Sequence, residues 1–85
     1  MKLRIIEEVR ENKRFDINYN CFYIQQRKFF RWVDVQSSDG ITSKRLDFKS
    51  YEDAEKQIYD VYFRGSGTAT KNGNVYKFKW YSCYY

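Results

Sequence analysis

The sequence predicts an α+β domain, in which an antiparallel sheet of four or five strands carries one helix on one face, in the order β-β-β-β-α-β. Three observations support this prediction. First, 85 residues suffice for one domain with one modest core, so residues 1–85 are expected to form a single domain. Second, apolar and polar residues alternate with the period of a strand through the first half of the chain and again at its end. Third, one segment between these regions has the period of a helix.

The first two strands follow from this alternation. Residues 2–9 place Leu3 and Ile5 on one face and charged side chains on the other. Residues 10–20 are mostly polar, and we expect a turn there with ragged strand ends. Residues 21–29 alternate again and form the second strand.

Two further strands complete the first half of the chain. One is expected at 30–36 and the other at 41–48, with an Asp-Gly pair at 39–40 between them. Asp-Gly tolerates the positive φ of tight hairpins, so it predicts a turn. The apolar side chains expected to face the helix from these strands are Phe22, Ile24, Val33, Val35, Leu46 and Phe48.

The helix is expected over 51–63, where the period changes. Ser50 suits the N-cap, and acidic residues follow it in the first turn, where they favour the positive end of the helix dipole. We expect Gly65 and Gly67 to end the helix and residues 65–74 to form a flexible loop. The apolar stripe consists of Tyr51, Ala54, Ile58, Val61 and Tyr62.

A last strand is expected over 75–85. Lys77 and Lys79 alternate there with large rings, so the two kinds of side chain lie on opposite faces. Rings as core and lysines as protection of a sheet edge explain this pattern without any ligand. The alternative is that the lysines hold a nucleic-acid backbone. The ring-bearing face comprises Tyr76, Phe78, Trp80 and Tyr84.

The charge balance points to an anionic partner without identifying one. Sixteen Lys and Arg stand against eleven Asp and Glu, which gives a net charge of +5. The acids concentrate in the expected helix, and the strands carry the positive excess. Aromatic residues are unusually abundant, at 21% of the chain, and they can serve as core or as a binding surface.

The chain contains two cysteines, Cys21 and Cys83. We expect free thiols, although a disulfide is possible if the strands that bear them meet. Two cysteines are too few for a zinc site from this chain alone. The N-terminal segment has no apolar run that suits a signal peptide or a membrane span, so a cytoplasmic location and no membrane partner are expected.

No motif indicates an enzyme. The chain has no His to act as a base for a nucleophile or as a metal ligand, and no glycine-rich loop precedes the helix. Asp34 and Asp47 could approach each other on adjacent strands, but with Arg31 and Arg45 nearby we expect ion-paired surface residues. We therefore predict no catalytic residues, no metal and no cofactor.

The best candidate site is the sheet face that points away from the helix. Arg meets phosphate or guanine in bidentate fashion, Gln reads adenine, and rings stack on unpaired bases. The alternative is that the first and last strands extend or cover this face and that the rings only pack there. The candidate nucleic-acid-binding residues are Tyr23, Gln25, Arg27, Lys28, Arg31, Trp32, Lys44 and Arg45, with Lys77 and Lys79 as a possible second patch.

Several features of residues 22–58 carry a resemblance to a known family. They are an aromatic-x-Ile strand, Trp-x-x-Val in the next strand, the Asp-Gly turn, and then Phe48-x-Ser50 before Asp53-Ala54-Glu55. This region resembles the three-stranded-sheet-plus-helix DNA-binding domain at the N-terminus of phage and transposon integrases, and it is also similar to plant ethylene-response-type domains and to small phage and bacterial proteins without an assigned role. The resemblance implies that the exposed sheet face enters the major groove.

The integrase resemblance also implies contact positions, at Gln25, Arg27, Trp32 and Arg45. The strands at the two ends of the chain are additions to the family's pattern. We therefore expect a small non-enzymatic protein that binds DNA or another nucleic acid through the basic aromatic face. The alternatives are a protein-interaction module, such as a phage-encoded inhibitor of a host protein, or a self-associating homodimer whose last strand pairs with its copy.

Overall fold

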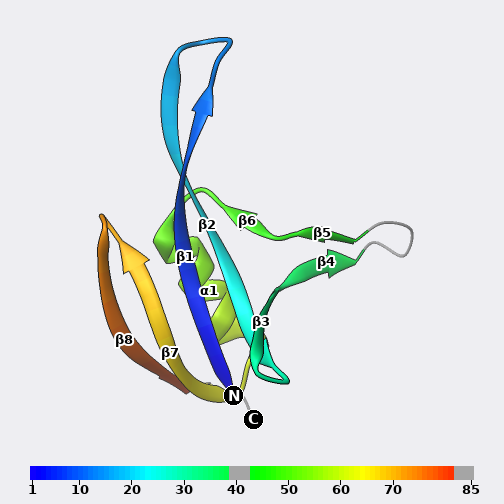
Figure 1. Cartoon of the computed structure of the whole chain (residues 1–85). Coiled ribbons are helices and arrows are strands. Elements are labelled where there is room, and N and C mark those ends of the chain that lie inside the picture. Colours follow the sequence, from blue (N-terminus) through cyan, green and yellow to red (C-terminus); the bar gives the residue numbers. More distant parts are fainter. Residues whose placement is uncertain (39–42, 82–85) are drawn as a thin grey trace.

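The predicted α+β class is confirmed by a computed structural model that describes residues 1–38 and 43–81. The main sheet has the strand order β3-β2-β1-β7-β8, and one helix packs on one of its faces (Figure 1). The predicted Asp-Gly turn and the positions of Cys83 and Tyr84 lie outside the described residues. The strands of this path are β1 (Lys2–Asn12), β2 (Ile17–Lys28), β3 (Arg31–Asp34), β7 (Arg64–Lys71) and β8 (Asn74–Tyr81).

Three short strands leave or border this path. β6 (Asp47–Phe48) pairs with β2, while β4 (Gln36–Ser38) and β5 (Ser43–Arg45) form a separate two-stranded ribbon. The predicted strands at 30–36 and 41–48 are therefore each divided into two. The divisions fall at Val35 and Leu46, where the amide of Val35 donates to the carbonyl of Ile24 and the amide of Leu46 donates to the carbonyl of Val35.

The pairing of β1 with β7 makes the sheet mixed rather than purely antiparallel. These two strands run parallel, with Leu3 opposite Gly67 and Ile5 opposite Ala69, while all other pairs are antiparallel. Parallel neighbours require a crossover, and here the helix lies in the connection between them. β1 is thus the central strand of the sheet and β8 is an edge strand, and neither of them lies across a face of the sheet.

The prediction of a loop over 65–74 is wrong, because most of this segment is β7 and the start of β8. Gly65 and Gly67 do not end the helix; they permit close approach within the sheet. A Cβ atom at Gly67 would collide with the backbone carbonyl of Leu3, and one at Gly65 would collide with the side chain of Trp80. Glycine, which has no Cβ atom, avoids both collisions. Because glycine has no apolar side chain, however, these positions do not show the apolar–polar alternation by which a strand is recognised in the sequence.

The helix α1 runs from Tyr51 to Val61, two residues shorter than expected. The hydroxyl of Ser50 accepts a hydrogen bond from the amide of Asp53 at 3.2 Å, which confirms the predicted N-cap. Tyr62 ends the helix in an extended conformation. Val61 is 58% exposed and does not belong to the buried stripe.

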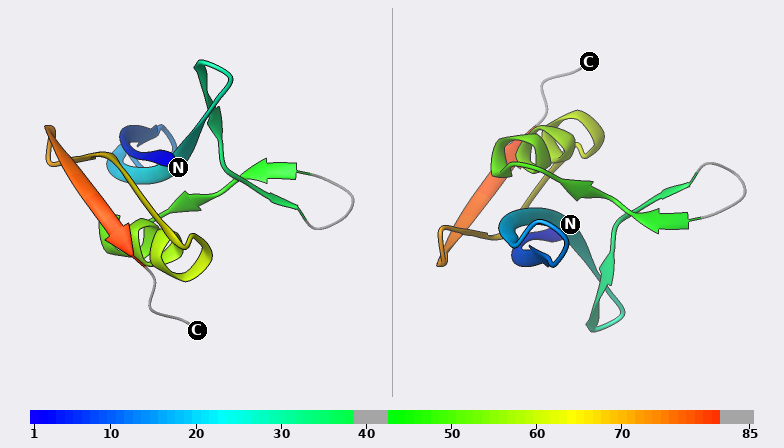
Figure 2. Two further views of the ribbon diagram at one scale, coloured as in Figure 1. Left: turned by 90° about the horizontal axis from the view of Figure 1, so that it is seen from below. Right: turned by 90° about the horizontal axis from the view of Figure 1, so that it is seen from above.

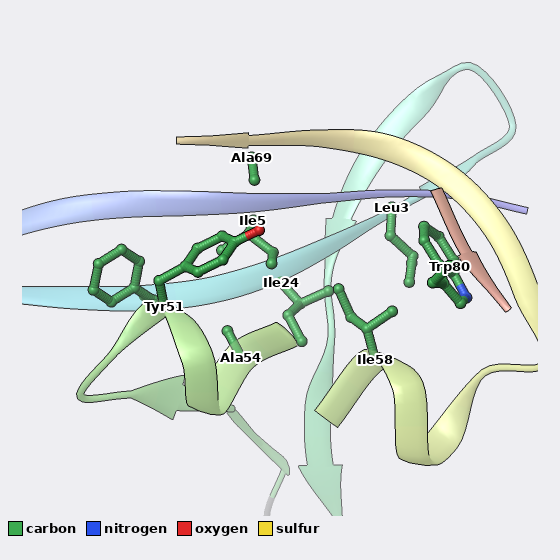
Figure 3. Close-up of a cluster of buried hydrophobic side chains, with 9 residues drawn as sticks. Leu3, Ile5, Ile24, Tyr51, Ala54, Ile58, Ala69 and Trp80 are labelled. Carbon is green, nitrogen blue, oxygen red and sulfur yellow. The ribbon is translucent and has the colours of Figure 1, made fainter. Parts of the chain in front are cut away.

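One face of the sheet and the helix enclose the core (Figure 3). Ile58 packs there with Leu3, Ile5 and Ile24, and all four are fully buried. Trp80 closes one end of the core and Tyr51 the other. The predicted helix-facing residues Phe22 and Ile24 are buried, and Val35 and Phe48 pack against the cluster. The remaining members of the buried cluster are Ala54 and Ala69.

Two hairpins differ from the sequence-based expectation. The β1–β2 hairpin continues as a two-stranded arm beyond the core, because the strands extend to Asn12 and from Ile17, where a ragged turn was expected (Figure 1). β2 and β3 are joined by a two-residue turn at Phe29 and Phe30, which were expected within strands. This second turn projects away from the helix (Figure 2).

Candidate nucleic-acid interface

The sheet face opposite the helix is open within the described residues. Strand alternation sets Tyr23, Gln25 and Arg27 on this face, since Phe22 and Ile24 of the same strand point into the core. The β2–β3 hairpin rises from the sheet on the side away from the helix, and β8 lies at the opposite edge of the sheet (Figure 2). The face predicted to bind a ligand is therefore present, and its rim is formed by strands far apart in the sequence.

A cavity of about 540 Å³ lies on this open face between β3 and β8. Its floor is formed by the start of β1 and by β7, and its sides by β8 and by the β2–β3 hairpin. We call this cavity the trough. Its polar, charged and indole side chains are Lys2, Arg27, Trp32, Ser66, Thr68, Lys77 and Lys79, and Gly67 and Phe78 complete the lining.

The trough is strongly cationic. Four of its lining residues carry a positive charge and none is acidic. The four cations, Lys2, Arg27, Lys77 and Lys79, are exposed, and among the described residues none of them forms an ion pair. Unneutralised like charges in one concavity repel each other and attract anions. Hydroxyl groups of Ser66 and Thr68 add uncharged donors of the kind that contact phosphate.

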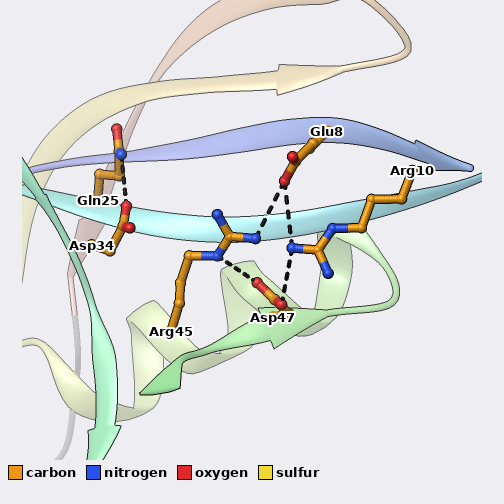
Figure 4. Close-up of polar contacts among 6 residues, drawn as sticks. All are labelled: Glu8, Arg10, Gln25, Asp34, Arg45 and Asp47. Atoms are coloured by element: carbon orange, nitrogen blue, oxygen red, sulfur yellow. Dashed lines mark hydrogen bonds and ion pairs between the residues drawn. The ribbon is translucent and has the colours of Figure 1, made fainter. Parts of the chain in front are cut away.

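Trp32 is held in place by a polar network that crosses three strands. The guanidinium of Arg4 lies over the indole, with Cζ 4.3 Å from the ring centroid. The Nε atom of Arg4 donates to the side-chain oxygen of Gln25 at 2.6 Å. The amide nitrogen of Gln25 in turn donates to Asp34 at 2.7 Å, as Figure 4 shows. Gln25 is thus engaged within the protein, and Trp32 is a half-buried wall of the trough rather than a freely presented ring.

A second polar group occupies the same face further along β1 and β2. Arg45 donates to Asp47 at 2.8 Å and lies 3.3 Å from Glu8, and Arg10 lies 3.3 Å from Asp47 and 3.6 Å from Glu8 (Figure 4). The guanidinium of Arg45 also lies over the ring of Tyr23, with Cζ 4.0 Å from the centroid. Two cations and two anions cancel here, so this group attracts anions far less than the trough does.

Cys21 is a buried free thiol on the same face, and Cys83 lies outside the described residues. Burial, with the carboxylate of Asp47 as a smaller contribution, raises the pKa of the Cys21 thiol. A protonated, buried thiol is a poor nucleophile. We therefore expect Cys21 to contribute to packing rather than to chemistry.

The structure divides the predicted site residues into three groups. Arg27 and Trp32 join Lys77 and Lys79 in the trough, so the two patches expected separately form one surface. Tyr23, Gln25 and Arg45 are engaged in intramolecular contacts and lie outside the trough lining. The last group is exposed beyond the trough: Lys28 and Arg31 flank the β2–β3 turn, and Lys44 lies on the β4–β5 ribbon.

Three polar residues of the trough were not anticipated as site residues: Lys2, Ser66 and Thr68. Lys2 was assigned to the polar side of its strand, but nothing in the local sequence indicated which strand would lie beside it. Ser66 and Thr68 belong to β7, which was expected to be a loop. The small residues of β7 hide the alternation by which strands are recognised, so no signal in the sequence identifies this segment as the partner of β1.

The described residues contain no cluster of three or more side chains suited to hold a metal ion. Among the same residues, no helix is long and apolar enough to cross a membrane. Comparison of the chain with family models, with curated proteins and with solved structures gives no match. The resemblance to integrase DNA-binding domains stays a prediction.

Proposed function

We propose that this protein is a non-enzymatic nucleic-acid-binding protein that holds the phosphate backbone in the trough. The observation that carries the proposal is the convergence of four exposed cations from β1, β2 and β8 on one concave surface, without an ion pair or an acidic lining residue in the part of the chain that the structure describes. Phosphate neutralisation by Lys and Arg supplies most of the affinity in such interfaces. The proposed contacts are Lys2, Arg27, Lys77 and Lys79 to phosphates, with Ser66 and Thr68 as hydrogen-bond donors.

The proposed contact surface, the trough, differs from the contact positions that the integrase resemblance implies. Arg45 is neutralised by Glu8 and Asp47, and Gln25 is hydrogen-bonded to Arg4 and Asp34. Neither side chain is available without breaking these contacts. The face therefore favours sequence-tolerant binding of a backbone over base reading in a major groove.

The test is a titration of fluorescently labelled oligonucleotides, monitored by anisotropy at 50 mM and 500 mM salt. Single-stranded DNA, single-stranded RNA and a DNA duplex of the same length are compared. We expect binding at low salt that weakens steeply at high salt. The variant Lys77→Glu/Lys79→Glu should lose binding.

A matched control variant is Lys13→Glu/Lys49→Glu. Both lysines are exposed in turns or bends outside the trough, and the change in net charge is the same. This control should bind nearly as well as the wild-type protein. Equal loss in both variants would mean that net charge alone drives the interaction, and no binding by the wild-type protein would reject the proposal.

A second candidate function is protein binding by the β1–β2 arm. Within the arm, Val9 is 65% exposed, Phe15 62% and Ile17 58%. Apolar side chains on an unsupported ribbon are typical of interfaces that are completed by a partner. A pull-down from nuclease-treated lysate, with Phe15→Ser/Ile17→Ser as the control, tests this candidate; equal recovery of proteins by both forms would count against it.

A third candidate function is self-association through β8. β8 ends the described strand order, so its outer edge is available for pairing with a second copy. Light scattering over a range of concentrations tests it, and a constant monomer mass would exclude it.

A further inference from the structure

Phe29 and Phe30 form the most exposed apolar feature among the described residues. They occupy the two-residue turn between β2 and β3, and their side chains are 93% and 94% exposed. No other large hydrophobic residue in the described ranges is exposed above 69%. The two rings therefore contribute almost no buried area to the folded protein.

The backbone at this turn is costly for these residues. Phe29 has φ 50° and Phe30 has φ 71°, the pair of positive values that a two-residue type I′ turn requires. Asn-Gly or Asp-Gly adopts this conformation readily, whereas bulky residues rarely do. Folding stability gives no reason to place two phenylalanines here. Strained positions that bear exposed rings favour a role in binding.

The surroundings of the two rings indicate an anionic partner. Lys28 and Arg31 pair directly beneath the turn, and both are exposed. The next pair down the hairpin is Arg27 with Trp32, both of which line the trough. Two residues of a strand span about 7 Å, so the backbone of Phe29 lies about 7 Å beyond that of Arg27 in the wall of the trough. Strand alternation turns Lys28 and Arg31 to the other face of the hairpin, where Lys28 lines a separate cavity with Val33. A chain that lies in the trough can therefore reach the tip past Arg27 and Trp32.

We propose that the ligand is single-stranded nucleic acid and that its unpaired bases stack on the rings of Phe29 and Phe30 while its phosphates follow the cations of the trough. This inference rests on the function proposed above. Bases in a duplex are already stacked, so their faces are not available to side chains at a hairpin tip. Phenylalanine has no hydrogen-bonding group, and stacking on it tolerates any base.

The turn itself provides a variant that is safe for folding. Phe29→Asn/Phe30→Gly installs the residues that a type I′ turn prefers, so the variant should unfold at a temperature equal to or above that of the wild-type protein. The probe is a labelled oligothymidylate. We expect the affinity of this variant to fall about tenfold or more, since stacking on a ring contributes strongly to the binding of each base. The wild-type protein should bind the single strand more tightly than a duplex of equal length, and the variant should lose most of this preference.

Phe15→Ala is the matched control, because it also removes an exposed ring from a hairpin turn, on the β1–β2 arm. Its affinity for the oligothymidylate should be unchanged. Unchanged affinity of Phe29→Asn/Phe30→Gly, together with loss of binding by Lys77→Glu/Lys79→Glu, would overturn the inference and leave the proposed function standing. Absence of binding by the wild-type protein would overturn both.

Exposed rings beside cations also suit an anionic lipid surface, so a vesicle assay forms the last arm. Vesicles of phosphatidylcholine with phosphatidylserine are sedimented with each protein. Co-sedimentation that depends on Phe29 and Phe30, with unchanged oligonucleotide affinity in the variant, would assign the rings to a membrane surface and overturn the inference.

Discussion

The guanidinium of Arg4, on the central strand β1, lies 4.3 Å over the indole of Trp32, on the edge strand β3. The intervening strand β2 supplies Gln25, which accepts from Arg4 and donates to Asp34. This network fixes one wall of the trough without contributing to its floor. It makes the position of Trp32 depend on a residue that does not line the cavity.

Replacement of Arg4 by Met should therefore destabilise the fold. The substitution removes the cation–π contact and leaves the carbonyl oxygen of the Gln25 side chain without its donor, which together cost about 1–2 kcal/mol of the free energy of unfolding. Urea denaturation followed by circular dichroism measures the change. Lys2→Met serves as the control, since Lys2 is an exposed cation on the same face of the same strand; equal effects of the two substitutions would contradict the role given to Arg4.

Gly67→Ala should be among the most disruptive single substitutions. The added Cβ would meet the backbone carbonyl of Leu3, so β1 and β7 could not keep their parallel pairing. We expect a loss of about 3 kcal/mol or more, which a domain of this size tolerates poorly. Gly73→Asn is the comparison, because Gly73 has open space around it and asparagine accepts its φ of 79°. Thermal unfolding of both variants checks the prediction, and a stable Gly67→Ala variant would show that these strands do not pair as described.

The buried thiol of Cys21 predicts a loss of stability at alkaline pH. The unfolded thiol loses its proton near pH 8.5, whereas burial raises the pKa of Cys21 in the folded protein. The folded state thus keeps a proton that the unfolded state has released. The free energy of unfolding should be unaffected by this group below about pH 8.5 and should fall as the pH rises through the folded pKa.

Denaturation with urea at several pH values between 7 and 9.5 measures this effect, in a Cys83→Ser background so that one thiol titrates. Cys21→Ala should reduce the slope on the alkaline side. Identical slopes in the two proteins would show that Cys21 is not protected from solvent. Tyr51, whose pKa is also raised by burial, contributes only at higher pH.

The salt dependence of binding tests how many cations contact phosphates. The four trough cations would give a slope of log affinity against log salt of about −3 on a single strand, at about −0.7 per phosphate contact. Lys77→Gln/Lys79→Gln should reduce the magnitude of this slope by about 1.4, whereas Lys28→Gln/Arg31→Gln, on the other face of the hairpin, should change it little. An unchanged slope in the Lys77→Gln/Lys79→Gln variant would place both lysines outside the path of the ligand.

Much of the fold could be predicted because its signals are local. Alternation in β2 separates Phe22 and Ile24 from Tyr23 and Gln25, and Ser50 marks the start of the helix. Each of these features depends on neighbours within a few residues. The same alternation predicts which side chains point away from the helix, but it does not decide whether the first and last strands leave that face open.

The trough itself could not be predicted in this way. Its floor depends on the parallel pairing of β1 with β7, which joins the first residues of the chain to a segment without apolar alternation. The roles of Arg45 and Gln25 depend on Glu8 and Arg4, partners that lie across strands. The β2–β3 turn was missed because its residues, Phe29 and Phe30, are the opposite of those that a tight turn prefers.

The most direct test of the central claim is a map of amide chemical shifts by NMR during titration with an oligothymidylate. We predict that the perturbed amides cluster at Arg27, Ser66, Thr68, Lys77 and Lys79, and that those of the helix Tyr51–Val61 stay in place. Perturbations confined to the helix or to the β1–β2 arm, or no perturbation at low salt, would contradict the assignment of the trough as the binding surface.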